Sequence, residues 1–159
     1  MAIRKIRIVE DEILRKKARR VEKFDDKLKE LIEDMFETME FAQGVGLAAP
    51  QIGLLRRVIV ADDREENRMA LINPEIVEKS GEEIDVEGCL SIPNKQGHVK
   101  RATFIKVKYN DVDGTEKELE AYDYFARILQ HEIDHTNGVL YTDIAEDVYD
   151  ISNTEEENK

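Results

Sequence analysis

The chain has 159 residues, of which 41% are hydrophobic, and this length and composition fit one globular domain. Its 24 basic and 36 acidic residues give a net charge of −12, which disfavours direct binding to DNA or any other nucleic acid. The single cysteine excludes an intrachain disulfide and a zinc site made of cysteines alone, and it favours a reducing compartment. No stretch approaches the roughly 20 apolar residues of a membrane span, and the N-terminus lacks a signal-peptide pattern. We therefore expect a cytoplasmic protein that does not enter a membrane.

The first predicted element is a long N-terminal amphipathic helix, which begins at Asp25 or Asp26 and ends near Gln43. Its apolar residues recur at helical spacing: Leu28, Leu31, Ile32, Met35 and Met39. The stretch Gly44–Gln51 is too rich in glycine and small residues to continue the helix and predicts a loop.

Short strands are expected next, over residues 58–61, 70–72, 76–79 and 104–109. Asp113-Gly114 predicts a hairpin turn into a further strand over residues 115–122. A second helix is predicted over residues 124–136, and Asn137-Gly138 is expected to end it. This order of elements predicts an α+β domain over residues 1–145, with small antiparallel sheets packed around the second helix.

The C-terminus is strongly acidic, because residues 143–159 hold seven acidic side chains against one lysine. Half of the net charge therefore lies in this segment. We expect residues 146–159 to form a disordered tail.

The second predicted helix carries His131-Glu132-Ile133-Asp134-His135. Imidazoles at i and i+4 lie on one helix face, where they can bind one metal ion, and Glu132 lies within reach of a water molecule on that ion. A surface helix with two unrelated histidines is the plainer interpretation. Tyr124 and Ile128 continue the histidine face as an apolar wall, which favours the metal site and would suit an apolar substrate side chain.

A third ligand would decide the class of site, because catalytic zinc or iron usually takes three protein ligands. The extended metalloprotease pattern fails, since Tyr141 stands where it needs a third histidine. A downstream carboxylate would come from Glu146, Asp147 or Glu155, and the remaining histidine, His98, is expected in an exposed loop or strand. A lone cysteine is most often a small buried residue. Beside two candidate histidine ligands, however, Cys89 would supply a soft thiolate that suits zinc or ferrous iron.

Three blocks in this order and spacing resemble the peptide deformylase family: Gly44-Val45-Gly46-Leu47-Ala48-Ala49-Pro50-Gln51, Glu87-Gly88-Cys89-Leu90-Ser91, and His131-Glu132-Ile133-Asp134-His135. The resemblance extends to about Asp143. It implies a metal-dependent hydrolase that removes the formyl group from the initiator methionine of newly made polypeptides and releases formate.

The resemblance also implies roles for individual residues. Cys89, His131 and His135 would hold one divalent metal, with Fe²⁺ expected and Zn²⁺ or Ni²⁺ able to replace it. Glu132 would transfer the proton, and the side-chain amide of Gln51 and the backbone N–H of Leu90 would bind the oxyanion. The peptide-binding residues would be Val45, Gly46, Gly88, Tyr124, Arg127 and Ile128.

The partners implied are N-formylmethionyl nascent peptides and, transiently, the ribosome, although an acidic tail does not suit docking on ribosomal RNA. Asp123 stands where many relatives have glycine, and we expect it to cap the second helix. Two alternatives stay open: a metallopeptidase with another third ligand, and a non-catalytic, metal-containing module that binds peptides.

Overall fold

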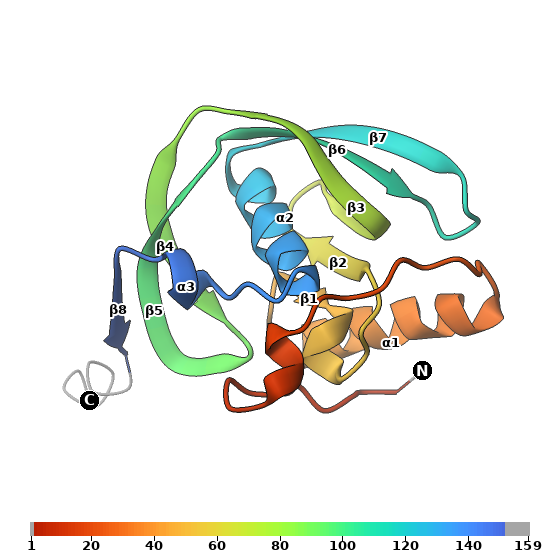
Figure 1. Cartoon of the computed structure of the whole chain (residues 1–159), viewed down its shortest axis with the longest axis horizontal. Coiled ribbons are helices and arrows are strands. Elements are labelled where there is room, and N and C mark those ends of the chain that lie inside the picture. Colours follow the sequence, from red (N-terminus) through yellow and green to blue (C-terminus); the bar gives the residue numbers. More distant parts are fainter. Residues whose placement is uncertain (1, 152–159) are drawn as a thin grey trace.

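Two antiparallel sheets organise the computed structural model, which describes residues 2–151 (Figure 1). The five-stranded sheet has the order β1-β2-β3-β6-β7, with β1 (Gly46–Ala48), β2 (Val58–Asp62), β3 (Arg68–Ser80), β6 (Phe104–Asn110) and β7 (Glu116–Tyr122). The three-stranded sheet has the order β4-β5-β8, with β4 (Glu83–Cys89), β5 (Ile92–Arg101) and β8 (Asp147–Asp150). Helices and antiparallel sheets together make the α+β class expected from the sequence.

The helical elements are α1 (Asp26–Phe41), α2 (Asp123–Thr136), the short α3 (Tyr141–Ile144), and the 3₁₀ turns η1 (Glu12–Arg15) and η2 (Ala49–Ile52). The chain does not begin with the predicted helix, because a largely irregular segment that includes η1 precedes α1. Among residues 2–151, none of the helices combines the length and apolar character that crossing a bilayer would require.

Helix α1 is capped at both ends by local hydrogen bonds. The Asp25 carboxylate accepts from the backbone N–H of Leu28 at 3.1 Å. At the other end Gln43, rather than a glycine, takes the left-handed conformation with φ 60°, and the N–H of Gly44 donates to the carbonyl of Met39 at 2.9 Å. This cap turns the chain sharply into β1.

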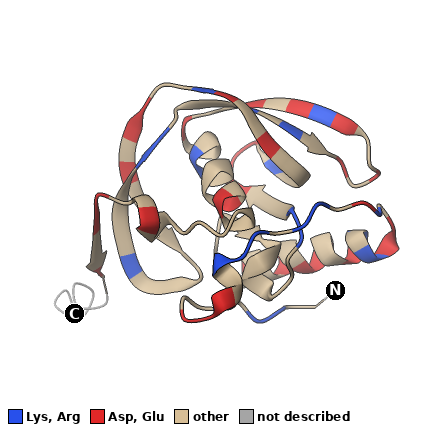
Figure 2. Ribbon diagram, in the orientation of Figure 1, with Lys and Arg blue, Asp and Glu red and all other residues tan. Residues whose placement is uncertain are grey.

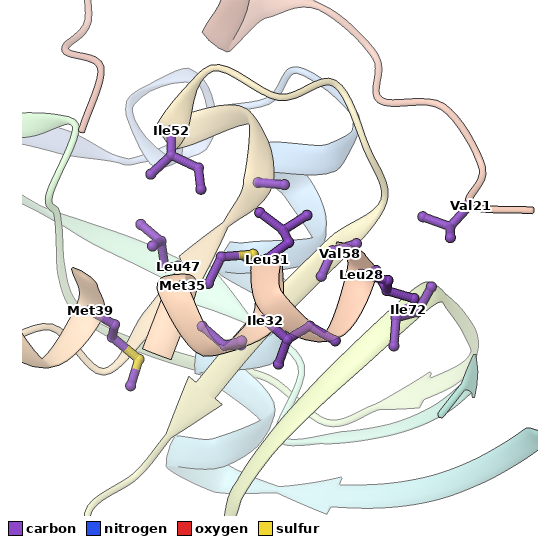
Figure 3. Packing of buried hydrophobic residues seen from close by; sticks show 12 residues of the cluster. Val21, Leu28, Leu31, Ile32, Met35, Met39, Leu47, Ile52, Val58 and Ile72 are labelled. Carbon is purple, nitrogen blue, oxygen red and sulfur yellow. The ribbon is translucent and has the colours of Figure 1, made fainter. Parts of the chain in front are cut away.

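Strand β2 is buried on both faces, which explains its uninterrupted apolar sequence. Val58 and Val60 pack in the core cluster beneath α1, shown in Figure 3, whereas Ile59 and Ala61 pack in a second cluster with α2. Helix α2 therefore lies against the five-stranded sheet on the face opposite α1. The packing of α2 against the five-stranded sheet therefore holds the side chains of α2 in fixed positions.

Several strands differ from the sequence-based prediction. The strands expected over residues 70–72 and 76–79 are one strand, β3, whose pairing with β6 shifts register between Ile72 and Glu75. The residue pattern alone predicts no strand at β1, β4, β5 or β8. In β4 and β5 many side chains are exposed, so the apolar pattern that marks a buried strand is weak.

The predicted disordered tail overlaps β8. Residues 147–150 pair with β5, so disorder does not begin at residue 146, and residues 152–159 lie outside the described part of the chain. Acidic residues also occur along α1, β4 and β7 (Figure 2), and most of them are exposed, whereas Asp34 and Glu87 are buried.

Asp123 does not cap α2, contrary to the expectation. Tyr122 occupies the N-cap position without a side-chain cap, and Asp123 is the first helical residue, with φ 50°. Its N–H donates to the carbonyl of Thr103 at 2.8 Å. The turn into α2 thus needs a left-handed residue, a conformation that glycine adopts at the lowest cost.

Candidate metal centre

Cys89 at the end of β4 meets the two histidines of α2. The Sγ of Cys89 lies 3.3 Å from Nε2 of His135, which lies 3.3 Å from Nε2 of His131. The three candidate ligand atoms lie within 4.8 Å of one another. His131 and His135 are buried, as expected for the inner face of a packed helix.

The spacing of these three ligand atoms matches the spacing of donors around one shared metal ion. Ligand nitrogens at the usual 2.0–2.1 Å from a tetrahedral zinc ion are about 3.3 Å apart. Burial lowers the pKa of His135, which keeps this imidazole neutral, the form that binds metals. A thiol or thiolate sulfur and two imidazole nitrogens form a donor set that suits Fe²⁺, Zn²⁺ or Ni²⁺.

Glu87 holds the ring of His131 in place. Its Oε1 lies 2.8 Å from Nδ1 of His131, and since an ionised carboxylate only accepts, Nδ1–H is the donor and Nε2 is the ring nitrogen that faces Cys89 and His135. Arg101 donates to both oxygens of Glu87 at 2.8 and 2.9 Å, and Arg127 donates at 2.6 Å. Burial alone would raise the pKa of Glu87, but hydrogen bonds from Arg101 and His131 outweigh it and lower the pKa to about 2.

Glu132 has the properties of a general base. Its side chain is buried, and Oε1 has no hydrogen-bond partner within residues 2–151. Burial, with the charge of Glu87 nearby, raises the pKa of Glu132 to about 7. A Cβ atom added to Gly46 would lie 2.5 Å from Oε2 of Glu132, so this close approach of β1 requires glycine.

The side-chain amide of Gln51 points toward Cys89. Its Oε1 accepts from the N–H of Ala48 at 3.0 Å, and its Nε2 lies 3.0 Å from Oγ of Ser91 and 3.6 Å from Sγ of Cys89. The hydrogen bond from Ala48 to Oε1 fixes the orientation of the Gln51 side-chain amide. The NH₂ group of Gln51 therefore faces Cys89. Leu90 lines the same cavity.

A cavity of about 520 Å³ opens beside these groups. Glu132, Gln51, Cys89 and His131 lie on its wall, together with the residues expected to bind peptide: Val45, Gly46, Gly88, Tyr124, Arg127 and Ile128. Tyr124 is about half exposed, whereas Ile128 is buried. The structure thus gathers every residue of the sequence-based site around one cavity, except His135, which lies behind it and contacts Cys89 and His131.

The other candidate ligands that the structure describes do not join this group, and Glu155 lies outside the described residues. His98 is partly exposed on β5, and its Nδ1 lies 2.9 Å from Oδ1 of Asp147. Tyr141 is buried and its ring stacks on that of His131, with centroids 6.0 Å apart. Among the described residues, the only metal-binding group that the geometry offers is Cys89, His131 and His135.

Sequence reasoning missed the roles of Glu87 and Arg101. Glu87 lies within the second sequence block, two residues before Cys89, where an extended chain turns both side chains to one side. That spacing was the available signal for Glu87. Nothing in the sequence marks Arg101 as its partner, because their contact depends on the pairing of β4 with β5.

Comparison with known proteins gives one consistent result. A family profile described as "Polypeptide deformylase" matches residues 3–150. The chain is 58% identical over 143 residues to peptide deformylase 1 of Clostridium acetobutylicum, covering 90% of this chain and 95% of that protein. It is 51% identical to the peptide deformylase of Finegoldia magna, covering 90% of each chain. The crystal structure of the Thermotoga maritima peptide deformylase superposes with a TM-score of 0.89 at 45% identity, covering 92% of this chain and 100% of that chain.

Proposed function

Because the chain belongs to the peptide deformylase family, whose members are hydrolases that remove the N-formyl group from nascent peptides, we propose which of its residues carry out that reaction. Cys89, His131 and His135 hold one divalent metal ion, with Fe²⁺ as the expected metal and Zn²⁺ or Ni²⁺ as substitutes. The convergence of their ligand atoms supports this assignment. A metal ion held there would polarise the formyl carbonyl and lower the pKa of a bound water molecule.

Glu132 is the proposed general base and acid. Its carboxylate takes a proton from the attacking water and delivers it to the amine of the methionine as the C–N bond breaks, so that formate leaves and the peptide gains a free N-terminus. A raised pKa of about 7 and an unpartnered oxygen support this role, because a proton carrier works best when its pKa is near the operating pH.

Gln51 and Leu90 are proposed to stabilise the oxyanion that forms on the formyl oxygen. The amide of Gln51 is already oriented by Ala48, so its N–H donor needs no reorganisation during the reaction. The backbone N–H of Leu90 would supply the second donor from the adjacent wall of the cavity.

The peptide is proposed to bind as an added strand between the end strands of the two sheets. Among the described residues, β1 is at the end of its sheet and β4 at the end of the other, and both border the cavity. Val45, Gly46 and Gly88 would offer backbone groups to the peptide. The methionine side chain would contact Tyr124, Ile128 and the stem of Arg127.

The cellular setting follows from the substrate. N-formylmethionyl nascent peptides are made in the cytoplasm, and we propose that the protein acts there. Because these peptides emerge from ribosomes, we also propose that the protein associates with ribosomes transiently. A net charge of −12 favours docking on a basic protein surface over docking on ribosomal RNA.

A formate-release assay on anaerobically purified, metal-analysed protein tests the assignment. We expect formate from formyl-Met peptides and no cleavage of unformylated ones. Glu132→Gln should retain the metal and lose formate release, whereas Cys89→Ala should lose the metal. Metal retained by Cys89→Ala would indicate the rival metallopeptidase site, and peptide binding without formate from fully metallated protein would indicate a binding module.

A further inference from the structure

A run of basic residues lies between η1 and α1, outside the proposed metal centre (Figure 2). Residues 15–23 hold six basic side chains and one acidic side chain, Glu22, and Arg56 and Arg57 follow η2. We call the eight basic side chains of residues 15–23 and 56–57 the basic strip. None of these eight described residues lines the cavity beside the metal centre.

The fold brings the two parts of the basic strip together. The backbone N–H of Arg19 donates to the carbonyl of Leu55 at 2.9 Å, and the N–H of Arg57 donates to the carbonyl of Arg19 at 3.0 Å. Arg19 and Arg56 thereby form a parallel β-bridge, which places their side chains on the same side of the paired segments. Both residues are exposed.

Buried contacts hold residues 15–23 in a fixed course. The N–H of Ala18 donates to the carbonyl of Thr136, at the end of α2, at 2.8 Å. The side chain of Asn73 accepts from the N–H of Val21 at 2.7 Å and donates to its carbonyl at 2.9 Å. Ala18 and Val21 are buried, whereas all six basic residues of this segment are exposed. The buried residues thus anchor the segment while its cations face solvent.

Most of the basic strip lacks an opposite charge. Arg15 pairs with Asp143, and within residues 2–151 no ion pair forms at the other basic residues of the strip. The negative end of the α2 dipole favours cations only near the last helical turn, so it does not account for the whole strip. Like charges on neighbouring residues repel one another, and a bound polyanion would remove this repulsion.

The chemistry of the basic strip fits phosphate groups. Five of its eight cations are arginines, whose planar guanidinium groups can donate two parallel hydrogen bonds to one phosphate. The strip has no exposed large apolar side chain that could insert into a membrane, as far as the described residues show. A row of cations on one surface is the usual footprint of nucleic-acid binding.

We propose that the basic strip docks on the phosphate backbone of RNA. RNA is favoured among phosphate polymers because the proposed substrate emerges from ribosomes, and in this respect the inference rests on the proposed function. The net charge of −12 still disfavours RNA on the other faces of the molecule, and the strip is the local exception. Docking should therefore occur in one orientation and leave the cavity open.

Fluorescence anisotropy of the full chain with a labelled RNA duplex tests this docking. We expect a Kd of about 10⁻⁵ M near physiological salt and a log–log salt slope of about −4, which corresponds to about four phosphate contacts. Lys17→Gln combined with Arg20→Gln should weaken binding by about tenfold and reduce the slope by about two. Lys79→Gln combined with Lys100→Gln removes the same charge from exposed lysines of β3 and β5 and should change Kd by less than about twofold.

Two further measurements separate the basic strip from the metal centre and from general charge effects. The Lys17→Gln and Arg20→Gln double variant should release formate from a short formyl-Met peptide at the native rate, because neither residue lines the cavity. Polyglutamate should displace the RNA poorly. Equal displacement by polyglutamate and by unlabelled RNA, or an unchanged Kd in the double variant, would overturn RNA docking. Absence of formate from native protein that binds RNA as expected would overturn the proposed catalytic site alone.

Discussion

Nδ1 of His131 lies 2.8 Å from Oε1 of Glu87, and both side chains are buried. The carboxylate sets the tautomer of the imidazole and directs its Nε2 toward Cys89 and His135. Arg101 and Arg127 bind the same carboxylate. One acidic residue of β4 therefore connects the proposed metal ligand on α2 with the buried cations of β5 and α2.

Glu87→Gln should weaken both metal binding and folding. The amide oxygen can still accept from His131, but Arg101 and Arg127 lose the charge that compensates them in the interior. We expect the free energy of unfolding to fall by about 3 kcal/mol and metal affinity to fall by about 10- to 100-fold. Denaturant unfolding and competition with a chelator measure the two effects. Asp85→Asn, at an exposed position on the same strand, is the control and should change neither quantity.

The stability that Glu87 contributes should disappear in acid. The pKa of Glu87 is lowered from 4.5 to about 2 in the folded protein, so the unfolded chain binds this proton more readily. The contribution is complete above about pH 4.5 and is lost as the pH falls through about 2. In metal-free protein, the difference in unfolding free energy between the native sequence and Glu87→Gln should shrink over this range. A constant difference would contradict the assigned ion pair.

Gly46→Ala should impair the reaction while sparing the metal. The added methyl group would meet Oε2 of Glu132 at 2.5 Å and displace the carboxylate from its place beside the ligands. We expect kcat to fall by about 100-fold with metal content unchanged, since proton transfer depends on close positioning. Gly44→Ala is the comparison, because its methyl group would meet only the flexible tip of Leu90. Equal losses in both variants would argue against a specific effect on Glu132.

Asp123→Gly should stabilise the protein. Asp123 has φ 50°, a conformation that costs residues with a Cβ atom more than it costs glycine. We expect the free energy of unfolding to rise by about 0.5 kcal/mol, measured by denaturant unfolding. Asp123→Ala controls for loss of the carboxylate and should give no gain. A glycine variant less stable than the alanine variant would exclude strain at this turn.

The sequence by itself determined the residues with strong local signals. The spacing of His131 and His135 and the apolar period of α1 depend only on helix geometry, and the hairpin at Asp113-Gly114 depends on turn chemistry. The three sequence blocks then indicated the family, which the comparisons confirm. Cys89 could be named as a candidate ligand for the same reason, because an incomplete two-histidine site needs a third donor.

Only the tertiary structure decided how these residues are held. The contacts of Glu87 with Arg101 and His131 arise from strand pairing and from the packing of α2, and neither leaves a periodic signal in the sequence. The sequence pattern places residues 147–150 in a disordered tail because they are acidic and polar, yet these residues form β8 through backbone pairing with β5, which does not depend on apolar side chains. Local residue patterns thus identified the chemistry, and long-range pairing decided its orientation and the rim of the cavity.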